Sequence, residues 1–319
     1  MACLLCGSTR LMRLYDNVRD RFGIAQEPHH FLRCEDCGSA TLDPLPAPET
    51  IASLYPSDYT FRPTADAGPH WRRLLGELER WLFYGRSYRQ RLAVLQQLTG
   101  LRHGRVLEVG CGNGLFLRGL RDEGYEVQGL EMSTGDVAYA RERFGLPVIH
   151  GTLDSVSLPT EHYDAVVLIY VLEHVLDPRG VVAHIYRLLK PGGWLVLGLP
   201  VIDSLQARWL GARWTAVTEA PRHITLPSFE GARRLLSAAV FAEVRTAPCP
   251  LLENAGHIAL SLVPSAATSC SQSARSLAPI LRRIGGGLAI APAFLVAWAE
   301  RRGPKHLARA GTTFFCGRR

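Results

Sequence analysis

The sequence has no block of like charges, no secretion signal at its start and no long unbroken apolar run. Its 36 Lys and Arg against 29 Asp and Glu give a formal net charge of +7, a mild bias that leaves nucleic acid, anionic lipid and acidic substrates open as partners. The opening "MACLLCGSTR" lacks the basic-then-apolar layout of a signal peptide, so we expect a cytoplasmic protein. With 319 residues, 47% of them hydrophobic, the chain can bury one large core with additions or two modest cores.

Eight cysteines are present, and four of them lie in the first 37 residues as two copies of Cys-x-x-Cys-Gly. Without a secretion signal, this arrangement favours a metal over disulfides. Two residues between thiolates let the backbone fold around one ion, and Gly7 and Gly38 can make the turn that follows. The pattern predicts a closed, structural Zn²⁺ site in a ribbon over residues 1–45, the alternative being free or redox-active cysteines. The predicted ligands are Cys3, Cys6, Cys34 and Cys37.

Two segments of different composition follow the ribbon. Residues 46–70 are rich in proline, which breaks helices and predicts a linker laid along a surface. Residues 71–100 repeat apolar residues at helical spacing among many arginines. They predict one or two amphipathic helices packed on the main domain.

The stretch Val106 to Leu117, "VLEVGCGNGLFL", has the pattern of a strand, a glycine-rich turn and a helix. Its glycines follow G-x-G-x-G, and Leu115 stands where a dinucleotide-binding loop would have its third glycine. The carboxylate of Glu108 would repel a pyrophosphate but can pair with a cationic ligand. Glu131 ends the next strand, where its carboxylate can accept hydrogen bonds from both hydroxyls of a ribose. S-adenosylmethionine has no phosphate and carries an amino group, a sulfonium and a ribose diol, so it fits all three features. The alternative is a glycine turn without a ligand.

The segments after this loop alternate between apolar strands and helices. An apolar run over Ala165 to Tyr170 leads into a loop, and a helix stopped by "PGG" is followed by a second run over Trp194 to Leu199. This alternation predicts an α/β fold with a doubly wound, mostly parallel sheet. Such open sheets bind ligands at the carboxyl ends of their strands.

With these motifs the chain resembles class I S-adenosylmethionine-dependent methyltransferases, over about Arg105 to Val244. It is most similar to the Methyltransf_23-like subgroup with an N-terminal zinc ribbon, on "FLRCEDCGSATLDPLP", "LYPSDYT", "VLEHVLDP", "LLKPGGWLVLGLP" and "APRHITLPS". The resemblance implies a seven-stranded Rossmann-like sheet, with residues 101–247 as the S-adenosylmethionine-binding domain. It also implies methylation of small molecules and sugars in natural-product, glycan or lipid pathways.

The resemblance also assigns residues to the methyl donor. The donor loop matches the glycines and Glu108, while Glu131 matches the ribose ligand and Met132 lies beside the adenine. Thr152 stands where the family's common acidic residue would be, so Asp154 is the weaker match at the adenine edge. Tyr170 to Glu173 would line the floor near the methyl group, and the loop's cysteine would be a small filler. The implied cofactor-binding residues are Glu108, Gly110, Cys111, Gly112, Gly114, Glu131, Met132, Leu153, Asp154 and Tyr170.

Two histidines are candidate catalytic bases for removing a proton from the acceptor. His174, in "LEHVLDP", follows the fourth predicted strand beside the donor pocket, and His223, in "EAPRHITLPS", lies in the loop after the fifth strand on the acceptor side. The alternatives are structural: His174 would only bond a backbone carbonyl and shape its loop, and His223 would likewise only support its own loop. Arg222 and Glu219 are candidate substrate contacts.

The stretch "SFEGARRLLSAAVFAEVRTA" predicts a helix followed by the sixth strand of the sheet, at Phe241 to Thr246. Residues 248–302 then depart from the pattern of a compact domain and are largely apolar. Within them, 284–299 holds sixteen uncharged residues flanked by arginines, too short and too broken by glycine and proline for a spanning helix. The alternatives are a helical cap over the acceptor site or an insertion that contacts a membrane peripherally. Residues 303–319 would add the last strand, which the family places antiparallel at the sheet edge.

These features predict an S-adenosylmethionine-dependent methyltransferase that acts on a small-molecule acceptor. The leading candidates for the acceptor are a sugar, a glycan or a lipid-linked intermediate. A quinone-like hydrophobic acceptor or RNA is the alternative among enzymes. A non-catalytic zinc-ribbon protein that binds nucleic acid is the alternative from another class. The loop between the cysteine pairs lacks dense Lys and Arg with interleaved aromatic residues, so we do not expect nucleic acid as a partner.

Overall fold

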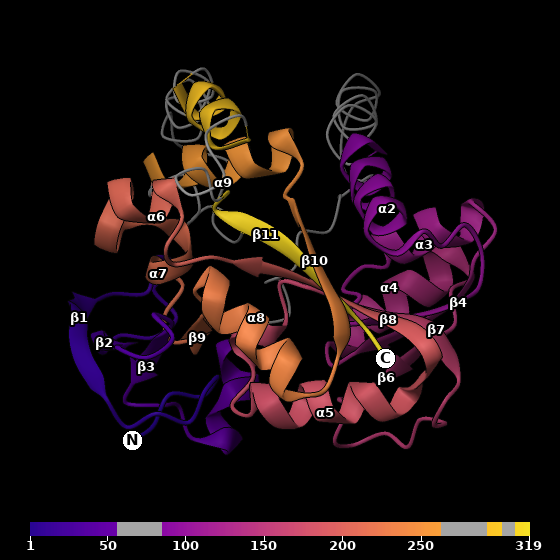
Figure 1. Ribbon diagram of the computed structural model, residues 1–319, viewed down its shortest axis with the longest axis horizontal. Coiled ribbons are helices and arrows are strands. Elements are labelled where there is room, and N and C mark those ends of the chain that lie inside the picture. Colours follow the sequence, from indigo (N-terminus) through magenta and orange to yellow (C-terminus); the bar gives the residue numbers. More distant parts are fainter. Residues whose placement is uncertain (56–84, 263–291, 302–309) are drawn as a thin grey trace.

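A seven-stranded sheet lies at the centre of the protein, in the order β10-β11-β8-β7-β4-β5-β6 (Figure 1). This computed structural model describes residues 1–55, 85–262, 292–301 and 310–319. Strands β6, β5, β4, β7 and β8 run parallel to one another, whereas β11 runs antiparallel to both of its neighbours. The predicted α/β fold with a mostly parallel, seven-stranded Rossmann-like sheet is therefore confirmed. The strands are β4 (Arg105–Val109), β5 (Glu126–Glu131), β6 (Val148–His150), β7 (Tyr163–Ile169), β8 (Leu189–Pro200), β10 (Ala242–Pro248) and β11 (Thr312–Arg318).

The place of β11 corrects one expectation. The strand is antiparallel, as expected, but it does not lie at the edge of the sheet. It pairs with β8 on one side, from Thr312 opposite Pro200, and with β10 on the other. The edge strand is β10, which follows α8 (Phe229–Ala238) in the chain. It does not pair with β8, because β11 lies between the two strands.

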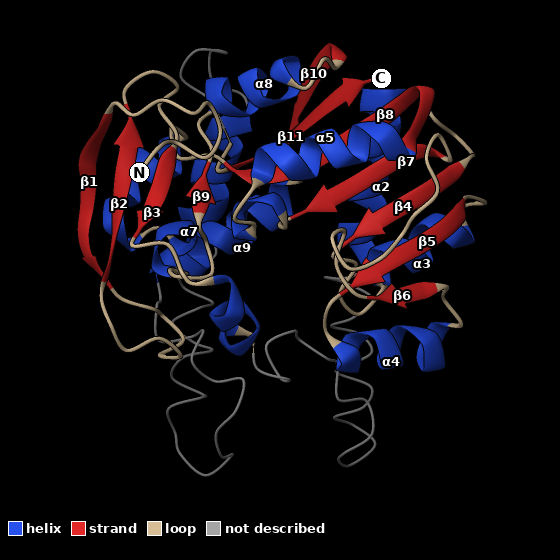
Figure 2. Cartoon of the chain, turned by 90° about the horizontal axis from the view of Figure 1, so that it is seen from below, coloured by secondary structure: helices blue, strands red, loops and turns tan. Residues whose placement is uncertain are grey.

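Side chains along the buried strands alternate between two core layers, as the period of two in a β-strand requires. Leu107 packs against α5 (Pro178–Leu188) and α8, whereas Val106 packs on the other face, against α2 (Gly85–Thr99) and α3 (Leu115–Asp122). Figure 2 shows these two helical layers on opposite sides of the sheet. The helix α4 (Thr134–Phe144) covers β5 and β6. Of the predicted helical segment 71–100, residues 85–99 are helical, and residues 56–84 lie outside the described part.

The N-terminal residues form a second, smaller sheet. Its antiparallel strands are β1 (Leu11–Val18), β2 (His29–Cys34), β3 (Ala40–Asp43) and β9 (Thr225–Leu226). Strand β9 belongs to the connection between β8 and β10, so a segment of the chain that also forms the central sheet completes the smaller sheet. Phe31 and Leu42 pack with Trp214 and Val217 in one buried cluster. The first residues of the proline-rich linker form a 3₁₀ helix, η1 (Pro48–Leu54).

A buried ion pair fastens the smaller sheet to the loop that carries β9. Arg222 Nη2 lies 2.6 Å from Asp20 Oδ1, and neither side chain is exposed to solvent. Asp20 also accepts hydrogen bonds from the amides of Phe22, Ile24 and Ala25. Burial by itself would raise the pKa of Asp20, but the bonds from Arg222 and these amides lower that pKa overall.

Two helical segments after β10 pack on each other over the carboxyl ends of the central strands. Ala255 and Ile258 of α9 (Leu251–Leu262) contact Ala293 and Ala297 of the helix over residues 292–301. Glu300 is 1% exposed and accepts hydrogen bonds from α6 (Leu205–Leu210), α9 and the backbone before β11. Within the predicted 248–302 segment, Pro248 ends β10 and residues 251–262 and 292–301 are helical, whereas residues 263–291 and 302 lie outside the described part.

In the described part of the chain, no helix is long and apolar enough to cross a membrane. The helix over residues 292–301 nevertheless leaves Leu295 70% exposed and Trp298 47% exposed. The predicted membrane-contacting run 284–299 is described only from residue 292 on.

Replacing Asp20 with Asn should lower the free energy of unfolding by about 3–5 kcal/mol, because it leaves the buried Arg222 guanidinium without a counter-charge. Urea denaturation followed by tryptophan fluorescence measures this change. The matched control is Asp16→Asn, whose carboxylate is exposed and should contribute less than about 1 kcal/mol. Equal stability of the two variants would show that the ion pair does not fasten the sheets.

Candidate active site

The glycine loop joins β4 to α3, as its sequence predicted. Gly110, Gly112 and Gly114 all have positive φ, at 69°, 51° and 77°. A Cβ on Gly110 would lie 2.5 Å from Val171 Cγ2, so the loop after β7 packs directly on this turn. The backbone therefore needs glycine here both for its conformation and for its close approach to the next loop.

Glu131 ends β5 beside this loop and is 8% exposed. Its Oε2 accepts a hydrogen bond from the Gly112 amide at 2.8 Å, and its Oε1 accepts one from the Ser133 amide at 2.8 Å. Burial raises the pKa of Glu131, and these two amides offset part of that increase. Each carboxylate oxygen still has a second lone pair, so this group can accept the two hydroxyls of a ribose.

Glu108, in β4, is 4% exposed, and its Oε2 has no hydrogen-bond partner among the described residues. Burial raises the pKa of Glu108 to about 8, an effect that the Arg91 charge reduces and the Glu131 charge increases. A buried carboxylate oxygen that lacks a hydrogen-bond partner is costly unless an opposite charge reaches it. The site therefore fits a ligand that brings a cationic group, such as the amino group and sulfonium of S-adenosylmethionine.

The other residues assigned to the donor lie in different surroundings. Cys111 is buried against α3 and α4, where burial raises the pKa of its thiol, so it fills space as expected. Met132 is 41% exposed beside Glu131. Leu153 is buried and Asp154 exposed, and both line an open cavity of about 520 Å³ that also includes His184.

Tyr170 follows β7 with a φ of 58°, a strained conformation for a bulky residue. Its hydroxyl donates to Glu253 Oε1 at 2.7 Å, and Arg91 Nη2 lies 2.7 Å from the same oxygen. The cluster Arg91–Glu253–Tyr170 thus joins α2, α9 and the loop after β7. The sequence analysis missed Arg91 and Glu253: Arg91 is one of several arginines in its helix, and Glu253 is the one acidic residue of the otherwise largely apolar α9.

A cavity of about 200 Å³ lies beyond Tyr170, at the carboxyl ends of the central strands. The helix α7 (Thr215–Thr218) and α9 form its far wall. Tyr170 lines it, and the next residue, Val171, packs on Gly110, so one loop connects the glycine turn to this cavity. The lining residues are Tyr170, His174, Pro200, Gln206, Trp214, Thr215, Ala216, Glu219, His223, His257 and Thr312.

The structure brings the two predicted histidines together. The ring centroids of His174 and His223 are 4.7 Å apart. Nδ1 of His223 lies 2.6 Å from the carbonyl oxygen of Ala216, and Nδ1 of His174 lies 3.0 Å from that of Arg222. Burial lowers the pKa of both imidazoles to about 3, with a further decrease at His174 from the His223 charge, so both rings are neutral at pH 7. His174 therefore makes the carbonyl bond of the structural alternative and also lines the cavity.

Three acidic or basic neighbours of these rings behave differently. Glu219 lines the cavity, with Oε2 at 3.5 Å from His223 Nε2, as expected for a residue near a substrate. Arg222 does not reach the cavity, and its prediction as a substrate contact is wrong, because its guanidinium is fully buried against Asp20. Glu173, in the 3₁₀ turn η3 (Leu172–His174), is fully buried, and burial raises its pKa to about 8.

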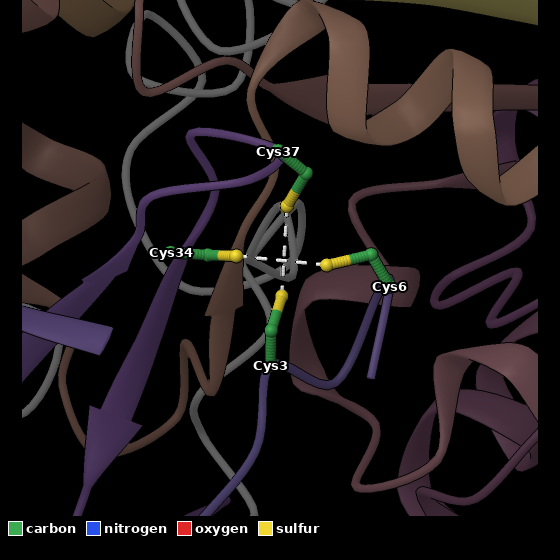
Figure 3. Close-up of side chains that lie close together, drawn as sticks. All are labelled: Cys3, Cys6, Cys34 and Cys37. Atoms are coloured by element: carbon green, nitrogen blue, oxygen red, sulfur yellow. Dashed lines mark hydrogen bonds between the residues drawn. The ribbon is translucent and has the colours of Figure 1, made fainter. Parts of the chain in front are cut away.

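The four N-terminal cysteines lie around one point (Figure 3). Their sulfur atoms all lie within 4.8 Å of one another, with Cys3 Sγ 3.6 Å from Cys37 Sγ and Cys6 Sγ 3.5 Å from Cys34 Sγ. Tetrahedral zinc thiolates place sulfur atoms about 3.8 Å apart, since each Zn–S bond is about 2.3 Å. The cluster has no disulfide and fits such an ion.

A family model described as a methyltransferase domain matches residues 78–285, more than half of the chain. The ubiquinone biosynthesis O-methyltransferase of Bordetella avium is 37% identical over 112 residues, which cover 33% of this chain and 46% of that protein. The protein of the same name from Photorhabdus laumondii is 35% identical over 125 residues, 37% of this chain and 51% of that protein. The chain thus matches only about half the length of these relatives.

The solved structure of phosphoethanolamine N-methyltransferase 2 from Haemonchus contortus, in complex with S-adenosyl-L-methionine, has the same fold. It superposes with a TM-score of 0.53 at 17% identity, covering 96% of this chain and 68% of that one. At this identity the comparison shows the shared fold alone.

Glu108 should make S-adenosylmethionine binding depend on pH. Below its pKa of about 8 the carboxyl is protonated in the free protein, so binding a cation there releases a proton, and affinity should rise from about pH 6 to about pH 8. Glu108→Gln should lose about tenfold or more of the affinity at pH 8, since a charge-assisted bond contributes about 1.5–3 kcal/mol.

Titration calorimetry at several pH values, in buffers of different ionisation enthalpy, measures both the affinity and the proton release. The ligand's own amino group titrates equally with wild type and variant, so only the difference between them reports on Glu108. The exposed Glu123→Gln is the matched control and should retain the wild-type profile. A Glu108→Gln variant with unchanged affinity and proton release would disprove this role.

Proposed function

Because this chain belongs to the methyltransferase-domain family (Methyltransf_23), we propose that it transfers the methyl group of S-adenosylmethionine to a hydroxyl oxygen of a small hydrophobic acceptor. The observation that carries this proposal is the single loop after β7. It packs on the glycine turn through Val171 and lines the acceptor cavity through Tyr170 and His174. A methyl group held over the turn would therefore face the cavity.

The donor site is proposed to hold S-adenosylmethionine through its charges and its ribose. The buried Glu108 accepts the amino group, Glu131 accepts the ribose hydroxyls, and the glycines allow the backbone to approach the ligand. Met132 covers the adenine, with Leu153 and Asp154 assigned to its edge by resemblance. The sulfonium of the bound donor supplies a good leaving group, so the protein contributes alignment and exclusion of water.

The acceptor is proposed to be a ring-shaped hydroxyl compound of the quinone type. The cavity is small, and Tyr170, Pro200 and Trp214 give it flat, largely apolar walls suited to a ring. The names of the two relatives agree with this class. His174 and His223 are neutral and line the cavity, so each ring can accept a hydrogen bond from the acceptor hydroxyl, although a pKa of about 3 makes both of them weak bases.

A sugar or lipid-linked acceptor is the second candidate. Gln206, Thr215 and Glu219 place hydrogen-bonding groups in the same cavity, which a sugar could use. The exposed Leu295 and Trp298 near the cap would suit a membrane surface that delivers a lipid-linked substrate. RNA is less suited, because the cavity is too small for a stacked base with its neighbours.

The cysteine cluster is proposed to hold a structural Zn²⁺ ion. Four thiolates leave no open position, so the ion would not take part in methyl transfer. The cluster also supports the acceptor side: the Ser228 hydroxyl donates to the Cys37 carbonyl oxygen, and the Ser228 amide donates to Ser39 Oγ at 3.0 Å. Ser228 caps α8 directly after the loop that carries His223.

The purified protein should contain one Zn²⁺ per chain at the cysteine cluster, measured by elemental analysis. Cys37→Ser should lose the ion and several kcal/mol of unfolding free energy, because structural zinc supplies on the order of 10 kcal/mol to a small module. Cys316→Ala, at a buried thiol outside the cluster, should retain the zinc. Full stability of Cys37→Ser after treatment with a chelator would contradict the structural role.

Methyl transfer is tested with labelled S-adenosylmethionine and separated acceptors: hydroquinones with alkyl tails, glycans, lipid extract and RNA. We expect label on a ring hydroxyl, and at least about tenfold weaker donor binding in Glu131→Ala, which removes charge-assisted bonds to the ribose. Exposed Glu142→Ala is the control.

The acceptor fractions separate the candidates. Label in the glycan or lipid fraction would favour the second acceptor class, and vesicle co-sedimentation of the same samples with Leu295→Asp tests the membrane contact. Label in RNA alone would overturn the small-molecule acceptor. Absence of donor binding by calorimetry would overturn the methyltransferase proposal itself.

A further inference from the structure

We propose that Glu173, His174 and His223 bind a divalent transition-metal ion at the acceptor cavity, and that this ion binds the acceptor oxygen. The binding of the metal concerns this chain's own residues, and only the binding of the acceptor oxygen by that metal rests on the proposed function. No residue of this group belongs to the cysteine cluster, so the ion would be separate from the structural zinc.

The three side chains already lie close enough to share an ion. One ligand atom from each lies within 4.8 Å of the other two. Ligands about 2.0–2.2 Å from a metal lie about 3–4 Å apart, so small side-chain rotations suffice. The three residues come from two segments, η3 and the loop before β9, which are held together by the bond from the Ile224 amide to the Glu173 carbonyl oxygen at 2.8 Å.

Both imidazoles have the orientation that metal-binding histidines need. In each ring, Nδ1 lies within hydrogen-bond distance of a backbone carbonyl oxygen, at 2.6 Å for His223 and 3.0 Å for His174, and the Tyr55 hydroxyl oxygen lies 2.9 Å from the same His174 nitrogen. The tautomer in which Nδ1 donates to the carbonyl leaves the lone pair on Nε2, and in that tautomer the Tyr55 oxygen acts as a second acceptor. A bond from Nδ1 to a carbonyl oxygen is the usual support of a histidine that ligates a metal.

Glu173 provides the independent observation. Its side chain is fully buried, and neither of its carboxylate oxygens has a hydrogen-bond partner among the described residues. Leaving an ionisable group buried in this way is unfavourable unless a charge or a proton compensates it. A cation between Glu173 and the two imidazoles would satisfy both oxygens at once.

The neighbouring charges also favour a cation here. His223 Nε2, with its lone pair, faces Glu219 Oε2 at 3.5 Å, and two acceptors facing each other are stabilised by a positive charge between them. The nearby guanidinium of Arg222 is compensated by Asp20, so it does not repel a second cation strongly. His257, the other histidine of the cavity, comes from α9 on the opposite wall.

The ligand types indicate the class of ion. Two imidazoles and one carboxylate suit first-row divalent metals such as Zn²⁺, Mn²⁺ or Fe²⁺, and three protein ligands leave coordination positions open. Because His174 and His223 line the cavity, an open position would face the acceptor. A hydroxyl bound there loses its proton more easily. Its proton passes to Glu219, the oxygen bonds the methyl carbon, and the breaking C–S bond leaves its electron pair on sulfur.

Manganese titration tests the site apart from the cysteines, because thiolates that hold Zn²⁺ do not exchange it for Mn²⁺. Zinc-loaded protein, stripped of weakly bound metal, is titrated with Mn²⁺ while electron paramagnetic resonance measures the free ion. We expect one Mn²⁺ per chain, and at least about tenfold weaker binding in Glu173→Gln and in His223→Ala. The matched control His184→Ala, on α5 away from the group, should bind Mn²⁺ as the wild type does.

The outcomes separate this proposal from the proposed function. Calorimetric binding of S-adenosylmethionine by Glu173→Gln shows that the variant is folded, and Glu131→Ala should leave the Mn²⁺ titration unchanged. Absence of Mn²⁺ binding in wild type, or equal binding in Glu173→Gln, would overturn the site. Methyl transfer that is unchanged in Glu173→Gln and in metal-free protein would overturn the role of the ion at the acceptor oxygen, even if the ion binds.

Discussion

The ion pair between Asp20 and Arg222 is the constraint on which the acceptor side of the protein depends. It joins the small N-terminal sheet to the loop between β8 and β9, and that loop carries Glu219 and His223. Because both partners are fully buried, either one alone would leave an uncompensated charge in the core. The small sheet, the cysteine cluster and the cavity beside His174 and His223 therefore form one structural unit, although their residues are far apart in the sequence.

The central sheet and the donor loop could be predicted from the sequence because their signals are local. Strands buried on both faces give continuous apolar runs, as over residues 165–169 of β7, and the glycine spacing together with Glu108 and Glu131 narrows the class of ligand that the loop can bind. The order of strands and helices along the chain then limits the topology to a doubly wound sheet. The strand β7 begins two residues before the predicted run, but β8 begins at Leu189, five residues before the predicted Trp194, and includes the "PGG" that was expected to end the helix.

The acceptor side could not be predicted in the same way, since its contacts join segments that are distant in the chain. Strand β9 has only two residues and pairs with β3 across more than 180 residues, so neither periodicity nor turn signals reveal it. The same holds for Arg91 with Glu253, and for the contact between the rings of His174 and His223. Arg222 has the polarity expected of a substrate contact, and only its tertiary pairing with Asp20 shows that it is structural.

Because β11 lies between β8 and β10, the central sheet cannot be completed until β11 has been synthesised. β10 ends at Pro248, whereas its neighbour in the sheet begins at Thr312, so a ribosome releases β10 well before the strand that separates it from β8. During this interval β8 and β10 each expose an unpaired backbone edge, of the kind that recruits other strands. At that stage the nascent chain carries two open strand edges, which makes it more prone to pair with other chains than the complete sheet is.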